Sequence, residues 1–464
     1  MAATLTITRL KTHLGSTQAK IYEPGSPNYK EAEQCFIEKP VLTIGVVKPQ
    51  NADEVALVLQ FCIHNQIEFT IRGGGHDCAG RTLVDGAIVI DMRDINYVVI
   101  SDDGRSARVG GGILSGNLAR VLGEQGLATP TGTISTVGYT GWATLGGYGP
   151  LTSHYGLGVD QIIGAKIVNA RGEIQDASEE LLVGIRGGGG SLGIVVELTI
   201  KVYYIPKILS STLIYESSDL EAALVLYNQY YEGLLTSGNL PTQLQLQPMI
   251  AKQPGHSASL LVLATWHGED IGEGHRWIKD LAGATACVME TTQEITLTEF
   301  LEANEKLVAW PSYGRVYTLN VKKLTNRLIT ILAKNSTNAP GGGMIFTYQS
   351  LLSTQDSEHK SVFGTRVSHH MLEICAVLPD KTHIEERIQW AIQVKADLET
   401  ENDENILTSS YISFHSHEDT DFKKAYGQHY ETLLALKRDY DGYNVFKHSI
   451  PSLPVEDKDK IIKG

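Results

Sequence analysis

One short segment combines residue types that can hold a phosphate group and attack a carbon atom. It follows an alternating run typical of a strand, and it reads Arg72-Gly73-Gly74-Gly75-His76. Glycines after a strand let the backbone turn tightly and bring its N–H groups close to an anion. A neutral histidine nitrogen beside them is a nucleophile. The segment predicts a pyrophosphate cradle with a nucleophile at its end, and a solvated glycine turn with an incidental histidine is the open alternative.

A second glycine cluster, at 188–193, has the spacing of the dinucleotide fingerprint G-x-G-x-x-G. That fingerprint needs a strand before it and a helix after it. Residues 194–204 are instead rich in β-branched side chains, so we expect a strand to follow. No glycine cluster is followed by Gly-Lys-Ser or Gly-Lys-Thr. These patterns therefore predict neither a Rossmann site nor a P-loop.

The elements that must position these residues differ between two parts of the chain. Glycine clusters crowd into the first 200 positions, among short strands and helices. After Pro206 glycine becomes sparse, and longer amphipathic helices alternate with strands, which is typical of an antiparallel sheet backed by helices. We expect an α+β protein with a first lobe at 1–205, a second lobe at 206–410 and a C-terminal segment at 411–464.

Length and charge exclude several classes of protein. The 464 residues exceed one ordinary domain of about 100–200 residues and predict two packed lobes. The formal charge is −14 and the basic residues are scattered, so no nucleic-acid partner is expected. No apolar stretch approaches the roughly 18–20 residues of a membrane span, so no membrane partner is expected. The absence of a recognisable secretory signal and five widely spaced cysteines indicate an intracellular protein with free thiols.

Further motifs follow the first one in a recognisable order along the chain. They are Val137-Gly138-Tyr139-Thr140-Gly141 with Gly146-Gly147-Tyr148-Gly149, the stretch from His154 to Asp160, the stretch from Ile185 to Val195, and Lys437-Arg438-Asp439-Tyr440-Asp441 with Asn444-Val445-Phe446. With the segment ending at His76, they resemble the vanillyl-alcohol-oxidase superfamily, and within it the berberine-bridge-enzyme-like and hydroxynicotine-oxidase-like flavoproteins. The likeness spans the chain and is dense in residues 40–205 and 405–450.

The resemblance implies an FAD-linked oxidase with a PCMH-type FAD-binding fold. Two α+β subdomains of the first lobe would hold FAD, an antiparallel-sheet substrate lobe backed by helices would face its isoalloxazine ring, and the C-terminal segment would return to the FAD lobe. His76 matches the histidine that bonds covalently to the flavin 8α-methyl group. Ile134 replaces a cysteine that makes a second bond in many members, so we expect a single 8α-histidyl bond at His76.

The remaining contacts to FAD that the resemblance implies are mostly backbone contacts, with the amides of the glycine triplet before His76 meeting the pyrophosphate. Val137 matches a position where a small residue leaves room for oxygen beside the flavin, and a buried strand valine is the open alternative. The expected cofactor-binding residues are Arg72, Gly73, Gly74, Gly75, His76, Val137, Gly138, Thr140, Gly141, Gly146, Gly147, Asp160, Gly193, Ile194, Val195, Tyr411 and Asn444.

A catalytic base is expected on a central strand of the second lobe. Plant members carry a glutamate there, and Phe346 occupies its place in this chain. Tyr348 shares the face of Phe346 because side chains alternate along a strand. It could accept a proton if a nearby cation lowered its pKa, and simple packing with a hydrogen-bonded hydroxyl is the alternative. Further candidates are His369, His370 and Glu373.

A second catalytic candidate, Tyr411, occupies the place of a Tyr-x-Asn motif near the flavin. Ser413 stands where the asparagine would be, which puts a side-chain amide contact in doubt. His415 and His417 have the spacing of a metal pair, but a third ligand is missing, so no metal is expected.

The resemblance implies hydride removal from a C–H bond next to oxygen or nitrogen in a small secondary metabolite, with O2 reduced to H2O2. Ring closure on oxidation is a further expected outcome. A redox-neutral cyclase or isomerase on the same scaffold is the alternative, and the apparent loss of a carboxylate at Phe346 favours it. Oxygen consumption distinguishes the two. The protein is expected to be a monomer or homodimer.

Overall fold

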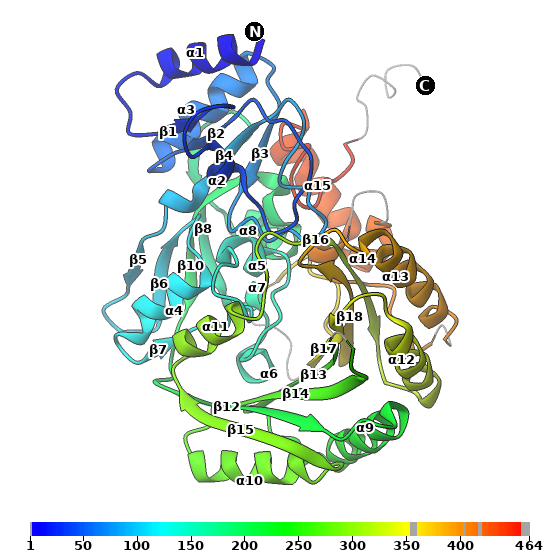
Figure 1. Ribbon diagram of the computed structural model, residues 1–464. Helices are drawn as coiled ribbons and strands as arrows, with labels where there is room; N and C mark the ends of the chain where they lie inside the picture. Colours follow the sequence, from blue (N-terminus) through cyan, green and yellow to red (C-terminus); the bar gives the residue numbers. More distant parts are fainter. Residues whose placement is uncertain (1, 254, 353–359, 402–403, 416–419, 456–464) are drawn as a thin grey trace.

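The first lobe begins with a four-stranded sheet that carries the glycine triplet. The computed structural model describes residues 2–253, 255–352, 360–401, 404–415 and 420–455. The sheet has the order β1-β2-β4-β3, with β2, β4 and β3 parallel and β1 antiparallel (Figure 1). Its elements are α1 (Ala2–Leu14), β1 (Lys20–Tyr22), α2 (Tyr29–Glu33), β2 (Gly45–Lys48), α3 (Ala52–His64), β3 (Phe69–Arg72) and β4 (Ile88–Asp91). Because β3 ends at Arg72, residues 73–76 leave the sheet at its edge.

A five-stranded antiparallel sheet completes the first lobe, in the order β5-β6-β10-β8-β9. Its strands are β5 (Val98–Ile100), β6 (Ser106–Gly110), β8 (Ile162–Val168), β9 (Ile174–Asp176) and β10 (Ile194–Lys201). The other helices of this lobe are α4 (Ser115–Gly123), α5 (Tyr139–Thr144), α6 (Thr152–Tyr155), α7 (Gly158–Gln161) and α8 (Glu179–Gly188), and a small sheet pairs β7 (Leu127–Ala128) with β11 (Tyr203–Tyr204). The strand expected after 188–193 is confirmed by β10, which excludes a Rossmann turn there.

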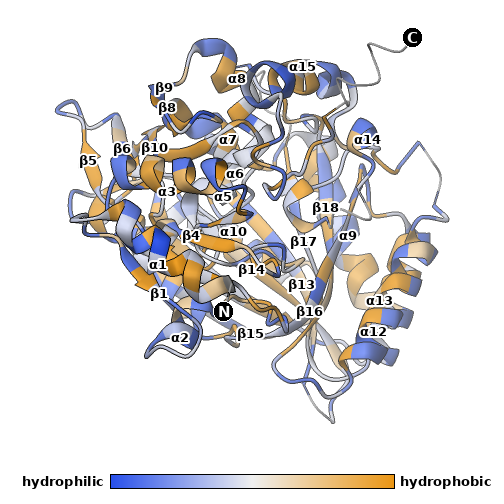
Figure 2. Ribbon diagram, turned by 90° about the horizontal axis from the view of Figure 1, so that it is seen from above, coloured by the Kyte–Doolittle hydropathy of each residue, from blue (hydrophilic) through white to orange (hydrophobic). Residues whose placement is uncertain are grey.

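The second lobe is built on one seven-stranded antiparallel sheet, in the order β15-β12-β14-β13-β17-β18-β16. Its strands are β12 (Ile208–Tyr215), β13 (Leu244–Lys252), β14 (Ala258–Trp266), β15 (Cys287–Ile295), β16 (Tyr313–Val321), β17 (Gly343–Leu351) and β18 (His369–Leu378). Helices α9 (Leu220–Ser237), α10 (Ile271–Ala282), α12 (Asn326–Asn338) and α13 (Ile384–Leu398) lie on the side away from the first lobe (Figure 1). Figure 2 shows polar residues on the outer side of α12 and α13, whose apolar side chains pack on the sheet. The α+β fold class is confirmed.

The helix α11 (Leu297–Glu305) departs from this pattern. It belongs to the second lobe by sequence, but it packs on α4 of the first lobe (Figure 1). Leu297, Phe300 and Leu301 are buried there against Ala119. The segment that follows α11 therefore runs along the first lobe before it enters β16.

The C-terminal segment folds back onto the first lobe through α14 (Phe422–Tyr426) and α15 (Tyr430–Asp441). The buried Nζ of Lys437 donates to Asp441 at 2.6 Å and to the carbonyl of Ser191 at 3.1 Å. Asp441 also accepts the backbone N–H groups of Val445 and Phe446 at 2.7 and 2.9 Å. We propose that the boundaries near 205 and 410 are those of the domains, with this segment as the third part.

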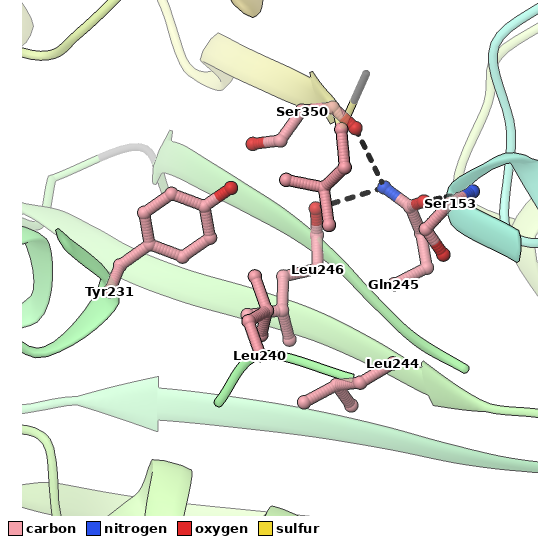
Figure 3. Close-up of a pocket in the computed structure, with 8 residues that line it drawn as sticks. Ser153, Tyr231, Leu240, Leu244, Gln245, Leu246 and Ser350 are labelled. Atoms are coloured by element: carbon pink, nitrogen blue, oxygen red, sulfur yellow. Dashed lines mark hydrogen bonds between the residues drawn. The ribbon is translucent and has the colours of Figure 1, made fainter. Parts of the chain in front are cut away.

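The two lobes also meet at Gln245 of β13. Its Oε1 accepts the backbone N–H of Ser153 at 3.0 Å, and its Nε2 lies 3.4 and 3.5 Å from the carbonyls of Leu246 and Ser350 (Figure 3). The cavity beside it measures about 10 Å³, which is room for one water molecule at most. The contact at Gln245 joins the lobes, and the cavity beside it is too small to bind a substrate. No helix in the described part of the chain combines the length and apolar character that crossing a membrane requires.

Candidate functional site

A large cavity lies between the lobes, and the first lobe, the second lobe and the C-terminal segment all line it. Its volume is about 1200 Å³, above the roughly 300–1000 Å³ typical of small-molecule sites. The wall contributed by the first lobe consists mainly of loops at the ends of strands, whereas the opposite wall is the face of the seven-stranded sheet that carries no helices. The space is sufficient for a large cofactor together with a small substrate.

Two glycine-containing loops meet at the bottom of the first-lobe wall. A Cβ atom on Gly74 would lie 2.2 Å from the backbone nitrogen of Gly138, and one on Gly138 would lie 2.3 Å from the nitrogen of Gly74. Only glycine permits this approach, because a Cβ atom at either position would collide with the other loop. The loops 73–76 and 136–141 therefore pack in direct backbone contact. The expected cofactor-binding residues that line the cavity are Gly73, Gly74, Gly75, His76, Val137, Gly138, Thr140, Gly141, Gly193, Ile194, Val195 and Tyr411.

The residues present on this wall fit a flavin dinucleotide. Backbone amides of the glycine loops can approach a pyrophosphate closely because no side chain covers them. The buried hydroxyls of Thr70 and Thr140 line the cavity and have no hydrogen-bond partner among the described residues. Buried hydroxyls normally have a partner, so a polar ligand in the cavity accounts for both.

His76 is enclosed by two aromatic rings and one hydroxyl. Its ring stacks on Phe36 with centroids 5.2 Å apart, and the Trp310 ring lies 4.7 Å away. His76 Nε2 is 2.7 Å from Thr136 Oγ1, which in turn is 2.9 Å from Glu305 Oε1. Burial lowers the pKa of His76 to about 4, although the charge of Glu305 opposes this shift. The imidazole is therefore neutral near pH 7 and offers a lone pair as a nucleophile.

Arg72 lies behind the glycine loop and does not line the cavity. Its buried guanidinium donates to the backbone carbonyls of Ala32 and Gln34 and lies 3.9 Å from Asp91. A Cβ on Gly75 would be 2.9 Å from Arg72 Nε, so the loop rests on this side chain. Arg72 supports the glycine loop from behind, and Arg72 itself is not part of the cavity wall.

Four other expected cofactor contacts, Gly146, Gly147, Asp160 and Asn444, also lie outside the cavity wall in the described chain. A Cβ on Gly147 would lie 2.8 Å from the Cα of Gly158, so these turns pack closely. Asp160 pairs with Arg366 at 2.8 Å, and Asn444 adopts a left-handed backbone with φ of 54°. These residues shape the loops around the cavity.

Tyr348 lies on the far face of β17 from the cavity. Its ring is buried beneath the helices, with the His370 ring centroid 5.4 Å away, and Phe346 is in the same core. Thr347 and Gln349, which alternate with them, line the cavity instead. Because Tyr348 cannot reach a substrate from that face, we do not retain it as a catalytic candidate.

Tyr411 does line the cavity, where its ring meets that of Tyr148 edge to face at 5.1 Å. Burial, and to a smaller extent the charges of Glu373 and Cys78, raise the pKa of Tyr411. Its hydroxyl is thus protonated near neutral pH and can donate a hydrogen bond. A role as base is disfavoured by the direction of this shift.

Of the three further candidates, all on β18, Glu373 lines the cavity, and His369 and His370 are buried elsewhere. Burial raises the pKa of the Glu373 carboxyl to about 8, and a hydrogen bond to Gln349 opposes the shift. A carboxyl with such a pKa in a cavity can exchange a proton with a ligand near neutral pH.

Three residues at or near the site carry no sequence signal that marks them. Glu305 of α11 contacts Thr136 beside His76, and Cys78 and Gln349 line the cavity from different lobes. Strand alternation through Met371, Glu373 and Cys375 could have placed Glu373 on the cavity face, once the face was known. No group of three potential metal ligands occurs among the described residues, and His417 lies outside them.

Comparison with known proteins agrees with this site. A family model described as an FAD binding domain matches residues 43–178. The chain is 32% identical over 439 residues to the FAD-linked oxidoreductase aurO of Gibberella zeae, covering 92% of this chain and 84% of that protein. It is 36% identical over 206 residues to (R)-6-hydroxynicotine oxidase of Paenarthrobacter nicotinovorans, covering 43% and 42% of the two chains.

A solved structure, 6-hydroxy-D-nicotine oxidase from Arthrobacter nicotinovorans, shares the fold. Its TM-score is 0.82 at 24% identity, over 95% of this chain and 98% of that one. The resemblance stated from the sequence motifs is therefore confirmed, and FAD is the cofactor that the family binds. With most of a relative covered at 32% identity, the chain belongs to the FAD-linked oxidoreductases.

Proposed function

We propose that this protein is an oxidase that removes a hydride from a C–H bond next to oxygen or nitrogen in a small apolar molecule, with Glu373 as the proton acceptor. The observation that carries the proposal is the position of Glu373. Its carboxyl has a pKa raised to about 8 by burial, and it opens into the same cavity as His76. An acid–base group and an FAD site thus share one enclosed space.

Covalent attachment at His76 is part of the same proposal. The neutral imidazole lines the cavity, and its ring is held in place by Phe36 and Trp310. Ile134 also lines the cavity and offers no sulfur. Burial raises the pKa of Cys78 well above its ordinary value, so that nearby thiol is a poor nucleophile. These features favour one bond, between His76 and the flavin 8α-carbon.

The lining of the second-lobe wall supports an apolar substrate with one polar group. Hydrophobic side chains form one part of this wall, and they include Ile214, Met249, Leu261, Leu263, Val316 and Met371. Polar side chains line the same wall, namely Gln247, Thr347, Gln349 and Glu373 together with Thr212, Lys252, Gln253, His256, Ser257 and Ser259. Such a surface suits a small natural product that is oriented by one hydroxyl or amine.

When bound on the first-lobe wall beside His76, FAD would supply the hydride acceptor, and its reoxidation by O2 would give H2O2. The residues of the chain perform the remaining tasks. Glu373 in its ionised form takes the proton of the substrate O–H or N–H group, and Gln349 orients this carboxyl by a hydrogen bond. Tyr411 keeps its proton and can donate a hydrogen bond to the substrate or cofactor. The cavity lies between the two lobes, which limits the access of water to it.

The redox-neutral alternative loses its support. It depended on an apparent loss of the carboxyl group at Phe346, and that side chain lies in the core beneath the helices. Glu373 supplies a carboxyl from the neighbouring strand β18 instead.

Oxygen uptake tests the proposal. The purified protein is mixed with a panel of small aromatic alcohols and cyclic amines, including (R)-6-hydroxynicotine, in an oxygen electrode with catalase added in a parallel run. We expect at least one compound to cause oxygen uptake that catalase halves, because catalase returns half of the oxygen from H2O2. Conversion of a panel compound without oxygen uptake would contradict the oxidase assignment.

A further inference from the structure

We infer that Glu305 is a positioning residue for covalent flavin attachment: through Thr136 it holds the proton of His76 on Nε2, leaves Nδ1 free to form the bond, and receives the Nε2 proton. This inference rests on the proposed attachment at His76. It assigns a role in the maturation of the cofactor site to a helix that belongs, by sequence, to the other lobe.

An unbroken series of hydrogen bonds connects Glu305 to His76 through Thr136. Glu305 accepts the Thr136 hydroxyl at 2.9 Å through Oε1 and the Thr136 backbone N–H at 3.0 Å through Oε2. Its Oε2 also accepts the Ser135 hydroxyl at 2.6 Å. Thr136 Oγ1 is then 2.7 Å from His76 Nε2. Three donors on Ser135 and Thr136 thus hold the Glu305 carboxylate, and the Thr136 hydroxyl also contacts His76.

Hydrogen counting assigns the tautomer of His76. A carboxylate can only accept, and a threonine hydroxyl has one proton to give. The Thr136 proton points to Glu305, so Thr136 Oγ1 must accept from His76 Nε2. The proton of the neutral imidazole is therefore on Nε2, and the lone pair is on Nδ1. No residue in the described chain hydrogen-bonds Nδ1, and His76 lines the cavity.

The bond-forming step can be balanced with these groups and O2. A bond forms between Nδ1 and the 8α-carbon of the flavin, and one C–H bond of that methyl group breaks. Two protons leave, one from the methyl group and one from Nε2, while one electron pair remains on the flavin ring. O2 then takes two electrons and two protons as H2O2. Thr136 and Glu305 give the Nε2 proton a path, which prevents a permanent positive charge on the buried imidazole.

The position of Glu305 depends on packing as well as on charge. It is the last residue of α11, and the apolar side chains of that helix are buried against α4. The following segment carries Trp310, which lies against His76, and Ser312, whose N–H donates to the Phe36 carbonyl at 2.7 Å. One segment of the second lobe therefore supplies both the carboxylate and one ring that holds the imidazole.

The test uses the full-length protein purified as expressed. Total flavin is measured first, and the fraction that stays with the acid-precipitated protein is then followed over time after addition of FAD. The variants are Glu305→Gln, Thr136→Val and the conservative Thr136→Ser. Glu302→Gln is the matched control, because Glu302 is exposed on the same helix.

We expect Glu305→Gln and Thr136→Val to slow attachment by about 100-fold, the lower end of the range for a lost proton-transfer partner. A glutamine oxygen still accepts from Ser135 and the Thr136 backbone, but its amide donates to Thr136 Oγ1 and reverses the His76 tautomer. Total bound FAD should be unchanged in both variants. Thr136→Ser and Glu302→Gln should attach flavin at the rate of the unchanged protein.

Equal rates in the unchanged protein, Glu305→Gln and Thr136→Val would overturn the role of Glu305 while leaving attachment at His76 intact. Absence of acid-stable flavin in the unchanged protein would overturn both proposals. If Glu305→Gln does not fold, Thr136→Val alone decides, with Thr136→Ser as its rescue. A merely structural role for Glu305 would lower total bound FAD in Glu305→Gln and would also contradict the inference.

Discussion

The two walls of the cavity are built in opposite ways. The first-lobe wall is made largely of backbone, where Gly74 and Gly138 approach so closely that neither tolerates a Cβ atom. The second-lobe wall is the bare face of a seven-stranded sheet, and its properties come from alternate side chains such as Gln349 and Glu373. The first-lobe wall suits a cofactor that is always the same molecule. Side chains on the second-lobe wall can be substituted one at a time without disturbing the sheet.

The largest effect that we expect from this contrast is the loss of covalently bound flavin when His76 is substituted. His76→Ala removes the nucleophile on the first-lobe wall, so no flavin should remain with the acid-precipitated protein. His64→Ala, at an exposed position on α3, serves as the control and should retain acid-stable flavin. Colour and flavin fluorescence of the pellet measure both. Acid-stable flavin in His76→Ala would show that another residue forms the bond.

The second-lobe wall should control turnover without controlling the cofactor. We expect Glu373→Gln to keep its flavin and to lower the rate of flavin reduction by about 100-fold, because a positioned proton acceptor is lost. The ionised carboxyl accepts the proton, and its pKa is raised to about 8. The rate in the unchanged protein should therefore rise with pH through about 8 and fall below it.

Rapid-mixing measurements of flavin bleaching from pH 6 to pH 10 test this pH dependence, with a substrate found by oxygen uptake. In Glu373→Gln the profile should lose the step near pH 8. A step that persists in the variant would assign the titration to another group and would weaken the distinction between the walls.

The close contact of the two glycine loops should appear as lost stability. A Cβ on Gly74 would lie 2.2 Å from the Gly138 nitrogen, so Gly74→Ala should lower the free energy of unfolding by about 1–3 kcal/mol and reduce bound FAD. Gly233→Ala is the control, because that glycine lies in α9 with no atom within 4 Å of its Cβ position. It should stabilise the protein by up to about 1 kcal/mol. Denaturant unfolding measures both, and equal stability of the two variants would contradict the clash.

The smallest effect is expected at Tyr348. Its ring is buried under the helices, so Tyr348→Phe should leave kcat and KM for oxygen uptake unchanged. A large loss of kcat with retained flavin would place the residue in the reaction and reverse our assignment of the two faces of β17.

The contrast also explains which parts could be predicted from the sequence. Glycine motifs report a backbone constraint directly, so the loop at 73–76, the Val137–Gly141 stretch and β10 could be placed without coordinates. Which faces of β17 and β18 meet the cavity depends on the pairing of these strands, in which Thr347 lies opposite Glu373, and on how the sheet packs against the first lobe. Tyr348 and Glu373 lie on opposite faces of these paired strands, and no local pattern shows which face meets the cavity.

Long-range contacts mark a second limit of prediction. Glu305 and Thr136 are 169 positions apart in the chain, and nothing in either local segment indicates that they touch. The same is true of Arg72, whose motif predicts a phosphate contact while its guanidinium is used by the carbonyls of Ala32 and Gln34. A motif specifies which residues are needed, and the tertiary packing decides which of them face the ligand.

The buried pair of Lys437 and Asp441 has a consequence for biosynthesis. This pair ties α15 to the Ser191 carbonyl and to the backbone of Val445 and Phe446, and Phe446, His448, Ser449 and Ile450 supply part of the cavity wall. A ribosome delivers these residues long after His76 has emerged. The nascent chain can therefore enclose its cofactor only after Ile450 has been synthesised, so any product truncated before that residue leaves the site open.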